Sequence, residues 1–563
     1  MFFSNNLFTR DAKVYPTSTF SGNQFSVLSE EKISESHESK LGDEDEQISA
    51  TERKKSKKYY KPQLFDVWAM GMATVLTGTY YGWNYGLTAG FGSYLIAQVI
   101  QGLSYIVLVF ALAEIISSTS FSGGAYGMAR VMLGFYPGFL MAMFELTEYI
   151  TYAGAAYQYV AAFLCTKLDW DMSYQSLVAF VLCVILTLLL LESDRIFWSI
   201  NALFGVYCVF GILFYCFGSL PYTNFMQNAS MHNDHSPSAP SNWFAGGMTV
   251  FLQVLPLTTW AFGGIEAGAL VTDMIHEPRR NLSRGLAIGV LSLFVLIIFT
   301  VFVTASLAPG VQSSSYDDDY GSLVNNMIFM KFGFDRMGIG GDFAEWLMLP
   351  AQVSMAFGFM LPSAKLFHAM SCSKLIPQRL GGNNLQICYM YTVPLSLGSC
   401  LLAIYYPKFN LSNVPVLFSS LTFLSDLYAY YQMQNDFVTL ERSFKSPFGT
   451  ISVLLAAGVF LLTIVSLLGF QQDDNFTLYF MICYIALLSA YYFFYAKDRQ
   501  IFSDAEQKTL LTLHVLKMNK KRRSSQRARS HYSVSLTRTR VSARKSSDAD
   551  TKSGHLTQHE IRS

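Results

Sequence analysis

Residues 77–86 read Thr-Gly-Thr-Tyr-Tyr-Gly-Trp-Asn-Tyr-Gly, and residues 260–266 read Trp-Ala-Phe-Gly-Gly-Ile-Glu. Each stretch places glycines among aromatic residues inside a long apolar run, and glycine weakens a helix interior. Within a bilayer, an interrupted backbone is tolerated only where it is buried in protein or lines a cavity. We therefore expect two broken membrane helices, unwound near residues 78–84 and 262–264. The alternative is that the glycines only allow helices to pack closely.

The composition assigns these runs to a membrane. Of the 563 residues, 52% are hydrophobic and 14% are charged, whereas soluble domains carry about 25% charged residues. The charge is concentrated at the two ends, so residues 62–496 hold only 37 charged side chains in 435 positions. A soluble core could not cover its surface so sparsely. This excludes an ordinary cytosolic enzyme and a folded nucleic-acid-binding domain.

Twelve runs are long and apolar enough to cross a bilayer, which takes about 20 residues of helix. They cover residues 65–85, 93–116, 138–164, 176–191, 197–219, 247–274, 286–308, 346–369, 391–406, 414–432, 451–470 and 478–496. With the N-terminus in the cytoplasm, the inner loops carry nine Lys and Arg residues and the outer loops carry four. This bias agrees with the positive-inside rule. We expect an all-α membrane protein with twelve transmembrane helices and both termini in the cytoplasm.

The two interrupted runs are the first and the sixth of the twelve. They therefore occupy matching positions in two halves of five helices, spans 1–5 and 6–10, with spans 11 and 12 added. Matched broken helices indicate an inverted-repeat transporter whose binding site lies near the middle of the membrane. The pattern predicts a LeuT-type 5+5 inverted repeat.

The ends of the chain differ from this apolar centre. Residues 1–61 are rich in Ser, Glu and Lys, and residues 501–563 are basic with many Ser and Thr. We expect both to be disordered cytoplasmic tails flanking a transporter domain at residues 62–500. The basic tail is typical of a chain near anionic lipid; the sharper interpretation is a phosphorylated regulatory segment.

Three stretches resemble the amino acid–polyamine–organocation (APC) permeases. Residues 260–266, followed by His-Glu-Pro-Arg-Arg-Asn at 276–281, are similar to the sixth-helix signature of that family. Residues 113–130 resemble its second-to-third-helix stretch, and residues 363–377 resemble its eighth-helix end. The resemblance covers about residues 62–500. It implies a secondary active transporter that works by alternating access, with no cofactor, in the plasma membrane.

The first break most resembles the ethanolamine-permease branch, in which Gly-Trp-Asn recurs. Many amino-acid members have Gly-small-Gly where this chain has Gly82, Trp83 and Asn84, and in them bare backbone N–H groups hold the substrate carboxylate. The resemblance therefore implies as substrate an amino acid or a small amine such as ethanolamine. Transport is expected to be coupled to protons or to proceed by exchange.

An ammonium group in a low-dielectric region needs an acidic or aromatic partner. Glu148 lies in the third span, one helical turn from Glu145 and Tyr152, so the three can share a face. Intramembrane carboxylates usually face the bundle interior and are functional candidates. In the arginine/agmatine antiporter, positions that match Glu148 and Tyr149 face the substrate. We expect Glu148 to be the counter-ion of the amine; the alternative is a structural pairing, for instance with Lys365.

Trp260 matches the aromatic gate of the family's sixth helix, where its ring could cover a cation. The alternative is a core-facing or lipid-facing tryptophan. The other expected substrate-binding residues flank the two breaks: Tyr81, Gly82, Trp83, Gly263 and Gly264.

Glu266 directly follows the second break, and a desolvated carboxyl there is the expected proton carrier. The alternative is that Glu266 only ties span 6 to a neighbour, and Asp426 is equally ambiguous. Sodium coupling would need oxygens from spans 1 and 8, where Ser354 and Ser363 are available, but no Ser-Ser or Thr-Ser pair occurs.

Two other classes of function are alternatives to a transporter. A nutrient receptor that signals through its tails without net transport is the runner-up, because the long C-terminal tail permits it. A membrane enzyme has no support, because the sequence holds no HExxH, GxSxG or P-loop motif. The expected partners are a small amine or amino acid and membrane lipids, not nucleic acid.

Overall fold

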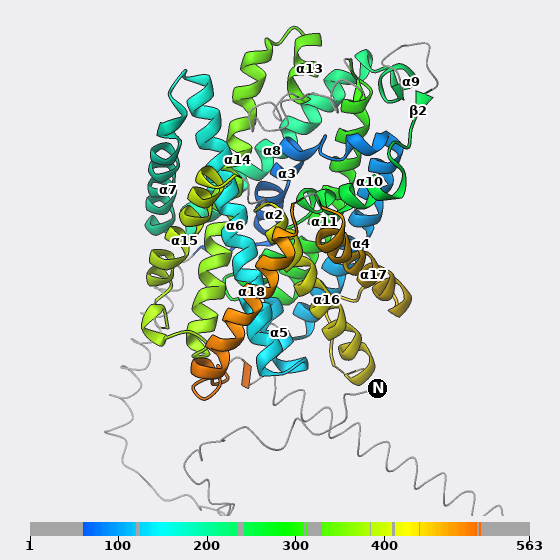
Figure 1. The fold of residues 1–563 in the computed structure, drawn as a ribbon. Coiled ribbons are helices and arrows are strands. Elements are labelled where there is room, and N and C mark those ends of the chain that lie inside the picture. The colour runs from blue at the N-terminus through cyan, green and yellow to red at the C-terminus, as the bar shows by residue number, and fades with distance from the viewer. Residues whose placement is uncertain are drawn as a thin grey trace, which may run out of the picture. The chain divides into compact units, whose positions relative to one another are not determined.

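The computed structural model describes residues 60–119, 124–232, 241–308, 310–311, 329–382, 384–407, 411–437, 440–471, 473–503 and 506–507 (Figure 1). The chain divides into two units, residues 1–59 and 60–563, and the account below concerns the second. The expected N-terminal tail and residues 508–563 of the expected C-terminal tail lie outside the described residues.

The first half of the described chain is helical. Its elements are α2 (Leu64–Val75), α3 (Thr77–Gly82), η1 (Leu87–Ala89), α4 (Gly90–Thr119), α5 (Gly124–Met132), α6 (Phe135–Lys167), η2 (Met172–Tyr174), α7 (Gln175–Glu192), α8 (Asp194–Ser219), η3 (Leu220–Tyr222) and α9 (Phe225–Asn228). A short antiparallel ladder follows, in which β1 (Met231–His232) pairs with β2 (Ser241–Asn242).

The second half repeats this character. Its elements are α10 (Gly247–Val254), η4 (Leu255–Ala261), η5 (Ile265–Val271), α11 (Pro278–Ala305), α13 (Phe329–Arg336), α14 (Gly341–Cys372), η7 (Gln378–Leu380), α15 (Leu385–Tyr405), α16 (Asn413–Asp436), α17 (Thr450–Gly469), α18 (Phe476–Tyr491) and the π-helical turn η8 (Tyr492–Ala496). In Figure 1, α6 and α14 lie among the other helices while α7 and α15 lie together at one edge.

Nine helices in the described part of the chain are long and apolar enough to cross a membrane. The other three expected spans have a different character. The first is split into α2 and α3, which are 12 and 6 residues long. The third and tenth are the long helices α6 and α16, and they carry the buried acids Glu145, Glu148 and Asp426 in their interiors. These acidic side chains are buried within the helix bundle, which is why α6 and α16 are less apolar than the other spans.

The break in the first span coincides only in part with the expected residues 78–84, because residues 77–82 are helical and a turn covers residues 83–86. The helix is interrupted at Leu76, and it then continues as α3 through Gly82 before a turn begins at Trp83. Gly78 instead permits a close approach, because a Cβ atom there would overlap the carbonyl oxygen of Trp260 in η4. At this glycine the close-packing alternative is correct. Directly after the break, Thr77 Oγ1 donates a hydrogen bond of 2.6 Å to a carbonyl of α14.

The break in the sixth span is confirmed at residues 262–264. This stretch is a turn between η4 and η5, and both flanking pieces are tight 3-10 helices. Gly264 has φ of +102°, a backbone conformation that side chains with a Cβ rarely adopt. The glycine is therefore required at this position for the chain to turn.

Helices of the two halves pack in corresponding pairs. α4 packs against α11, α6 against α14, α3 against η4, and α2 against η5. These contacts join span 2 to span 7, span 3 to span 8, and the broken span 1 to the broken span 6. Two further contacts correspond in the same way. α2 packs against α8, which joins span 1 to span 5, and η4 packs against α16, which joins span 6 to span 10. The two interruptions are thereby held against each other.

The contact between α3 and η4 generates a stability prediction. Gly78→Ala should lower the melting temperature of the purified protein, because its new methyl group overlaps the Trp260 carbonyl and overpacking costs about 1–3 kcal/mol. The measurement is thermal unfolding in detergent. Gly458→Ala in α17 is the matched control, since a Cβ there meets nothing within 4 Å. Equal melting temperatures for the two variants would contradict the close approach.

Candidate functional site

Glu148 of α6 lies fully buried beside the second break. Its exposed fraction is 0%, and neither carboxylate oxygen receives a hydrogen bond from a protein donor. The carboxyl group of Glu266 lies within hydrogen-bonding reach of it. Two carboxylates cannot donate to each other, so only a proton between them would complete that bond. A buried carboxylate without a donor is costly and indicates a missing partner.

The turn itself places Glu266. Both carboxylate oxygens of Glu266 accept a hydrogen bond from the backbone N–H of Gly264, at 3.1 Å each. The positive φ of Gly264 aims this N–H at the side chain two residues later. A Cβ at Gly264 would overlap the ring of Phe359 in α14. The break therefore serves as the support of an acidic group.

Two further acids complete a cluster, which we call the acidic site: Glu145, Glu148, Glu266 and Asp426. One oxygen of Glu145 accepts a hydrogen bond of 3.0 Å from Tyr149, and its other oxygen has no donor. Asp426 of α16 likewise has one oxygen without a donor. The four groups act on one another electrostatically. Two unit charges about 4 Å apart repel by about 4 kcal/mol at an effective dielectric constant of 20.

The ion pairs found in the described part of the chain do not reach the acidic site. They are Arg130–Glu506, Lys167–Glu345, Lys365–Asp273 and Arg442–Glu114, and none includes a member of the acidic site. Lys365, the alternative partner weighed for Glu148, lies 2.6 Å from Asp273. That particular pairing is therefore wrong.

Aromatic side chains enclose the acidic site. Tyr152 packs edge-on against Trp260 with ring centroids 5.0 Å apart, and stacks on Phe359 at 5.1 Å. Tyr149 also stacks on Phe359, with ring centroids 5.6 Å apart. Tyr105 of α4 stacks on Phe262 at 5.5 Å. The aromatic ring expected over a cation, Trp260, is thus held by Tyr152 next to the break.

The three residues of the first span that were expected to bind substrate have different surroundings. Trp83 is buried in the core, 3% exposed. Gly82 ends α3, and its carbonyl accepts a hydrogen bond of 3.4 Å from Tyr94. Tyr81 lies in α3, but its side chain is outside the described part. Their contact with substrate stays a prediction.

The glycines of the sixth span do not offer unoccupied donors. The N–H of Gly263 donates to the carbonyl of Thr259 at 2.8 Å, and that of Gly264 donates to Glu266. A Cβ at Gly263 would come within 2.5 Å of the Tyr152 hydroxyl. Both glycines lie at the site as expected, but their N–H groups bind protein oxygens.

The sequence of the chain matches a family of known membrane proteins over most of its length. The family model described as amino acid permease matches residues 63–491. The chain belongs to the amino acid permease family. It is therefore a multi-pass integral membrane protein of a transporter family, not of an enzyme family, and the family implies a LeuT-like fold. The broader APC resemblance is confirmed at this level.

A relative of the permease is known from a bacterium. An uncharacterized transporter of Rhizobium meliloti (strain 1021) is 24% identical over 250 residues, which are 43% of this chain and 52% of that protein. The chain thus matches about half the length of this relative. Ethanolamine as substrate, the coupling ion and the plasma membrane stay predictions.

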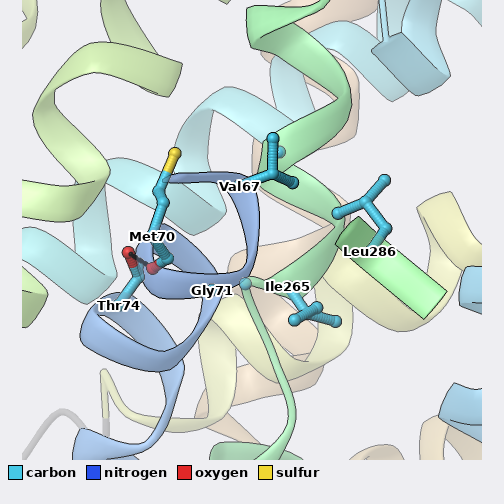
Figure 2. A pocket seen from close by; sticks show the side chains of 8 residues that line it. Val67, Met70, Gly71, Thr74, Ile265 and Leu286 are labelled. Carbon is cyan, nitrogen blue, oxygen red and sulfur yellow. Dashed lines mark hydrogen bonds between the residues drawn. The ribbon is translucent and has the colours of Figure 1, made fainter. Parts of the chain in front are cut away.

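The permease also has a small pocket on the α2 side of the second break. It is lined by Val67, Met70, Gly71, Thr74, Gly264, Ile265, Gly268 and Leu286. Figure 2 shows Met70 and Thr74 projecting from α2, with Ile265 and Leu286 across from them. Only Gly264 belongs both to this pocket and to the residues expected at the site. The pocket is mostly apolar, so it does not extend the acidic site.

Sequence reasoning missed two contributors to the permease site. Phe359 lies against both Tyr149 and Tyr152, yet one more phenylalanine in an apolar run carries no signal. Asp426 was ambiguous, and the structure brings it into the acidic site. The rule that intramembrane carboxylates face the interior was the signal that could have placed it.

Proposed function

We propose that this permease moves a small primary amine such as ethanolamine, or an amino-acid-type cation, by proton-coupled alternating access. The observation that carries the proposal is Glu148, a fully buried carboxylate with no protein donor beside the break in the sixth span. The corresponding helix pairs support a 5+5 inverted repeat of ten spans followed by two more. In such folds the substrate binds at the breaks near the middle of the membrane.

The charge of the acidic site favours a cation over a zwitterion. A substrate carboxylate would meet the four acids of the acidic site, and like charges in a low-dielectric region repel strongly. It would also need backbone donors, and those of Gly263 and Gly264 already bind protein oxygens. An ammonium group offers three N–H donors to the oxygens that lack them. The aromatic rings beside it add cation–π attraction.

The junction of spans 1 and 8 favours protons over sodium. The hydroxyl of Ser354 lies 2.6 and 2.7 Å from the carbonyls of Ala73 and Ala351, which share its single proton. Ser363 donates within its own helix, to Met360 at 3.0 Å. Sodium binds through free oxygen lone pairs, and here the Ser354 proton already engages the carbonyl of Ala73, the acceptor from the first span. Proton coupling at Glu266 needs no such oxygens.

Glu148 generates the direct test of this function. Glu148→Gln keeps the side-chain shape and removes the charge, so binding of ethanolamine should weaken at least about tenfold, or 1.4 kcal/mol. The basis is that removing one partner of a buried charge pair typically costs about 3–5 kcal/mol. Binding to the purified protein and uptake into proteoliposomes are measured, with expression and melting temperature as checks on folding.

The matched control is Glu145→Gln, on the same face of α6 with one oxygen bonded to Tyr149. It should change affinity much less. Unchanged affinity in a folded Glu148→Gln variant, or equal losses in the two variants, would make Glu148 part of a structural polar cluster. Binding without accumulation in proteoliposomes would instead favour the receptor.

A further inference from the structure

Glu148 and Glu266 come from different halves of the fold, and their carboxyl groups interact directly. Glu148 belongs to α6 in the first half, and Glu266 begins η5 in the second. Glu266 accepts hydrogen bonds from backbone N–H groups of the turn, among them that of Gly264, whereas neither oxygen of Glu148 has a protein donor. The pair thus lacks one positive charge and one hydrogen-bond donor. A shared proton supplies both.

Resting on the proposed function, we infer that this carboxyl pair holds one proton in the empty permease and releases it when the ammonium group binds. Proton and amine then compete for the same two carboxyls. The permease would exchange one proton for one amine, and a zwitterionic amino acid would not be its preferred substrate.

The surroundings of the pair supply no alternative countercharge in the described chain. The titratable groups that act on Glu148 or Glu266 from the neighbouring elements are acids and phenols. They are Glu145, Tyr149 and Tyr152 of α6, Tyr105 of α4 and Asp426 of α16. The hydroxyl of Tyr149 is already directed at Glu145. A proton or a substrate cation is what remains to neutralise the pair.

The exchange balances in charge and in hydrogen bonds. The empty pair carries one proton and one negative charge. The loaded pair carries two carboxylates and one ammonium, which again sums to one negative charge. The proton leaves to the aqueous side on which the site is open, and no bond other than O–H is broken. Because the net charge is equal in both forms, either form can pass through the low-dielectric interior at similar cost.

The test measures protons and amine together on the full-length purified protein. Ethanolamine hydrochloride is added to the protein in weakly buffered detergent solution with a pH indicator. We expect about one proton released per amine bound, and an affinity for amine that rises up to about tenfold per pH unit while the pair is protonated. Glu192→Gln, which alters an exposed carboxylate at the end of α7 outside the acidic site, is the control and should keep the release.

Glu266→Gln separates the two roles. The amide cannot share a proton as the carboxyl does, so amine binding to Glu148 should persist with no proton release and a flat pH dependence. Amine binding by the unaltered protein without proton release would overturn the exchange and leave the proposed function standing. Failure of the folded, unaltered protein to bind ethanolamine or any amino acid would overturn the proposed function itself.

A second, independent observation concerns the chain after the last span. Arg130 of α5 and Glu506 form an ion pair of 2.6 Å in which both side chains are 0% exposed. The other Arg130 amino group donates to the carbonyl of Ile501 at 3.1 Å. The guanidinium carbon also lies 5.2 and 5.1 Å from the ring centroids of Phe135 and Phe502, which pack on each other. This segment is firmly docked on α5.

The same carboxylate also reaches the end of α14. The second oxygen of Glu506 accepts hydrogen bonds from Ser373 Oγ at 3.0 Å and from the N–H of Ser503 at 2.7 Å. The N–H of Ile501 donates to the carbonyl of Ser373 at 3.0 Å. Glu506 therefore bridges α5 of the first half and α14 of the second.

We propose that residues 501–503 with Glu506 are a latch that restrains movement of α5 against the end of α14. Release of the latch would change the rate at which the transporter interconverts between its open forms. The latch is continuous in sequence with the basic, Ser- and Thr-containing residues 508–563. A partner that binds residues 508–563 would therefore act on a segment that directly follows the latch in the sequence.

Cys372, the last residue of α14, reports on the latch because it is a partly buried free thiol. In a Cys483→Ser background, which removes the exposed thiol, Glu506→Gln should speed maleimide labelling of Cys372 several-fold and alter the rate of amine exchange. Deleting residues 508–563 keeps the latch and should leave labelling unchanged. Should Glu506→Gln fail to fold, Ser373→Ala removes only one bond of the latch and gives the same readout. Unaltered labelling and exchange in a folded latch variant would refute the proposal.

Discussion

Two carboxyl groups that face each other away from water constrain the rest of this permease. Leaving both ionised in a low-dielectric interior is costly, so in the proposed mechanism the site holds a proton or a cation at every stage. The turn at Gly264 sets one of these groups in place through two hydrogen bonds. The aromatic rings of Tyr152 and Trp260 pack edge-on beside this turn. In the proposed mechanism, the interruption of span 6 serves mainly to hold an acid at membrane depth.

The helices could be predicted from the sequence because membrane burial is a local property of composition. All twelve apolar runs coincide with helical segments of the structure, including α6 and α16, whose acids make them less apolar than the rest. The break in span 1 was placed only in part because one glycine can mean either an interrupted helix or a close contact. Only the position of Trp260, distant in sequence, shows that Gly78 serves the contact.

The site was predictable residue by residue but not as an arrangement. Glu148 and Glu266 were each recognised, because a carboxylate inside a membrane span is rare and usually faces the interior. That they form a pair depends on how α6 meets the second break, which no local pattern encodes. The ion pair of Glu506 with Arg130 could not be predicted for the same reason, since the sequence around Glu506 is typical of a basic tail.

The most direct test of the account is the protonation state of this carboxyl pair during binding. Infrared difference spectra of the purified permease, recorded with and without ethanolamine, report protonated carboxyl groups through their C=O stretch. The account predicts that one protonated carboxyl band disappears when the amine binds, that carboxylate bands grow, and that Glu148→Gln and Glu266→Gln each abolish this change. Saturation with amine while the protonated carboxyl band stays unaltered would contradict it.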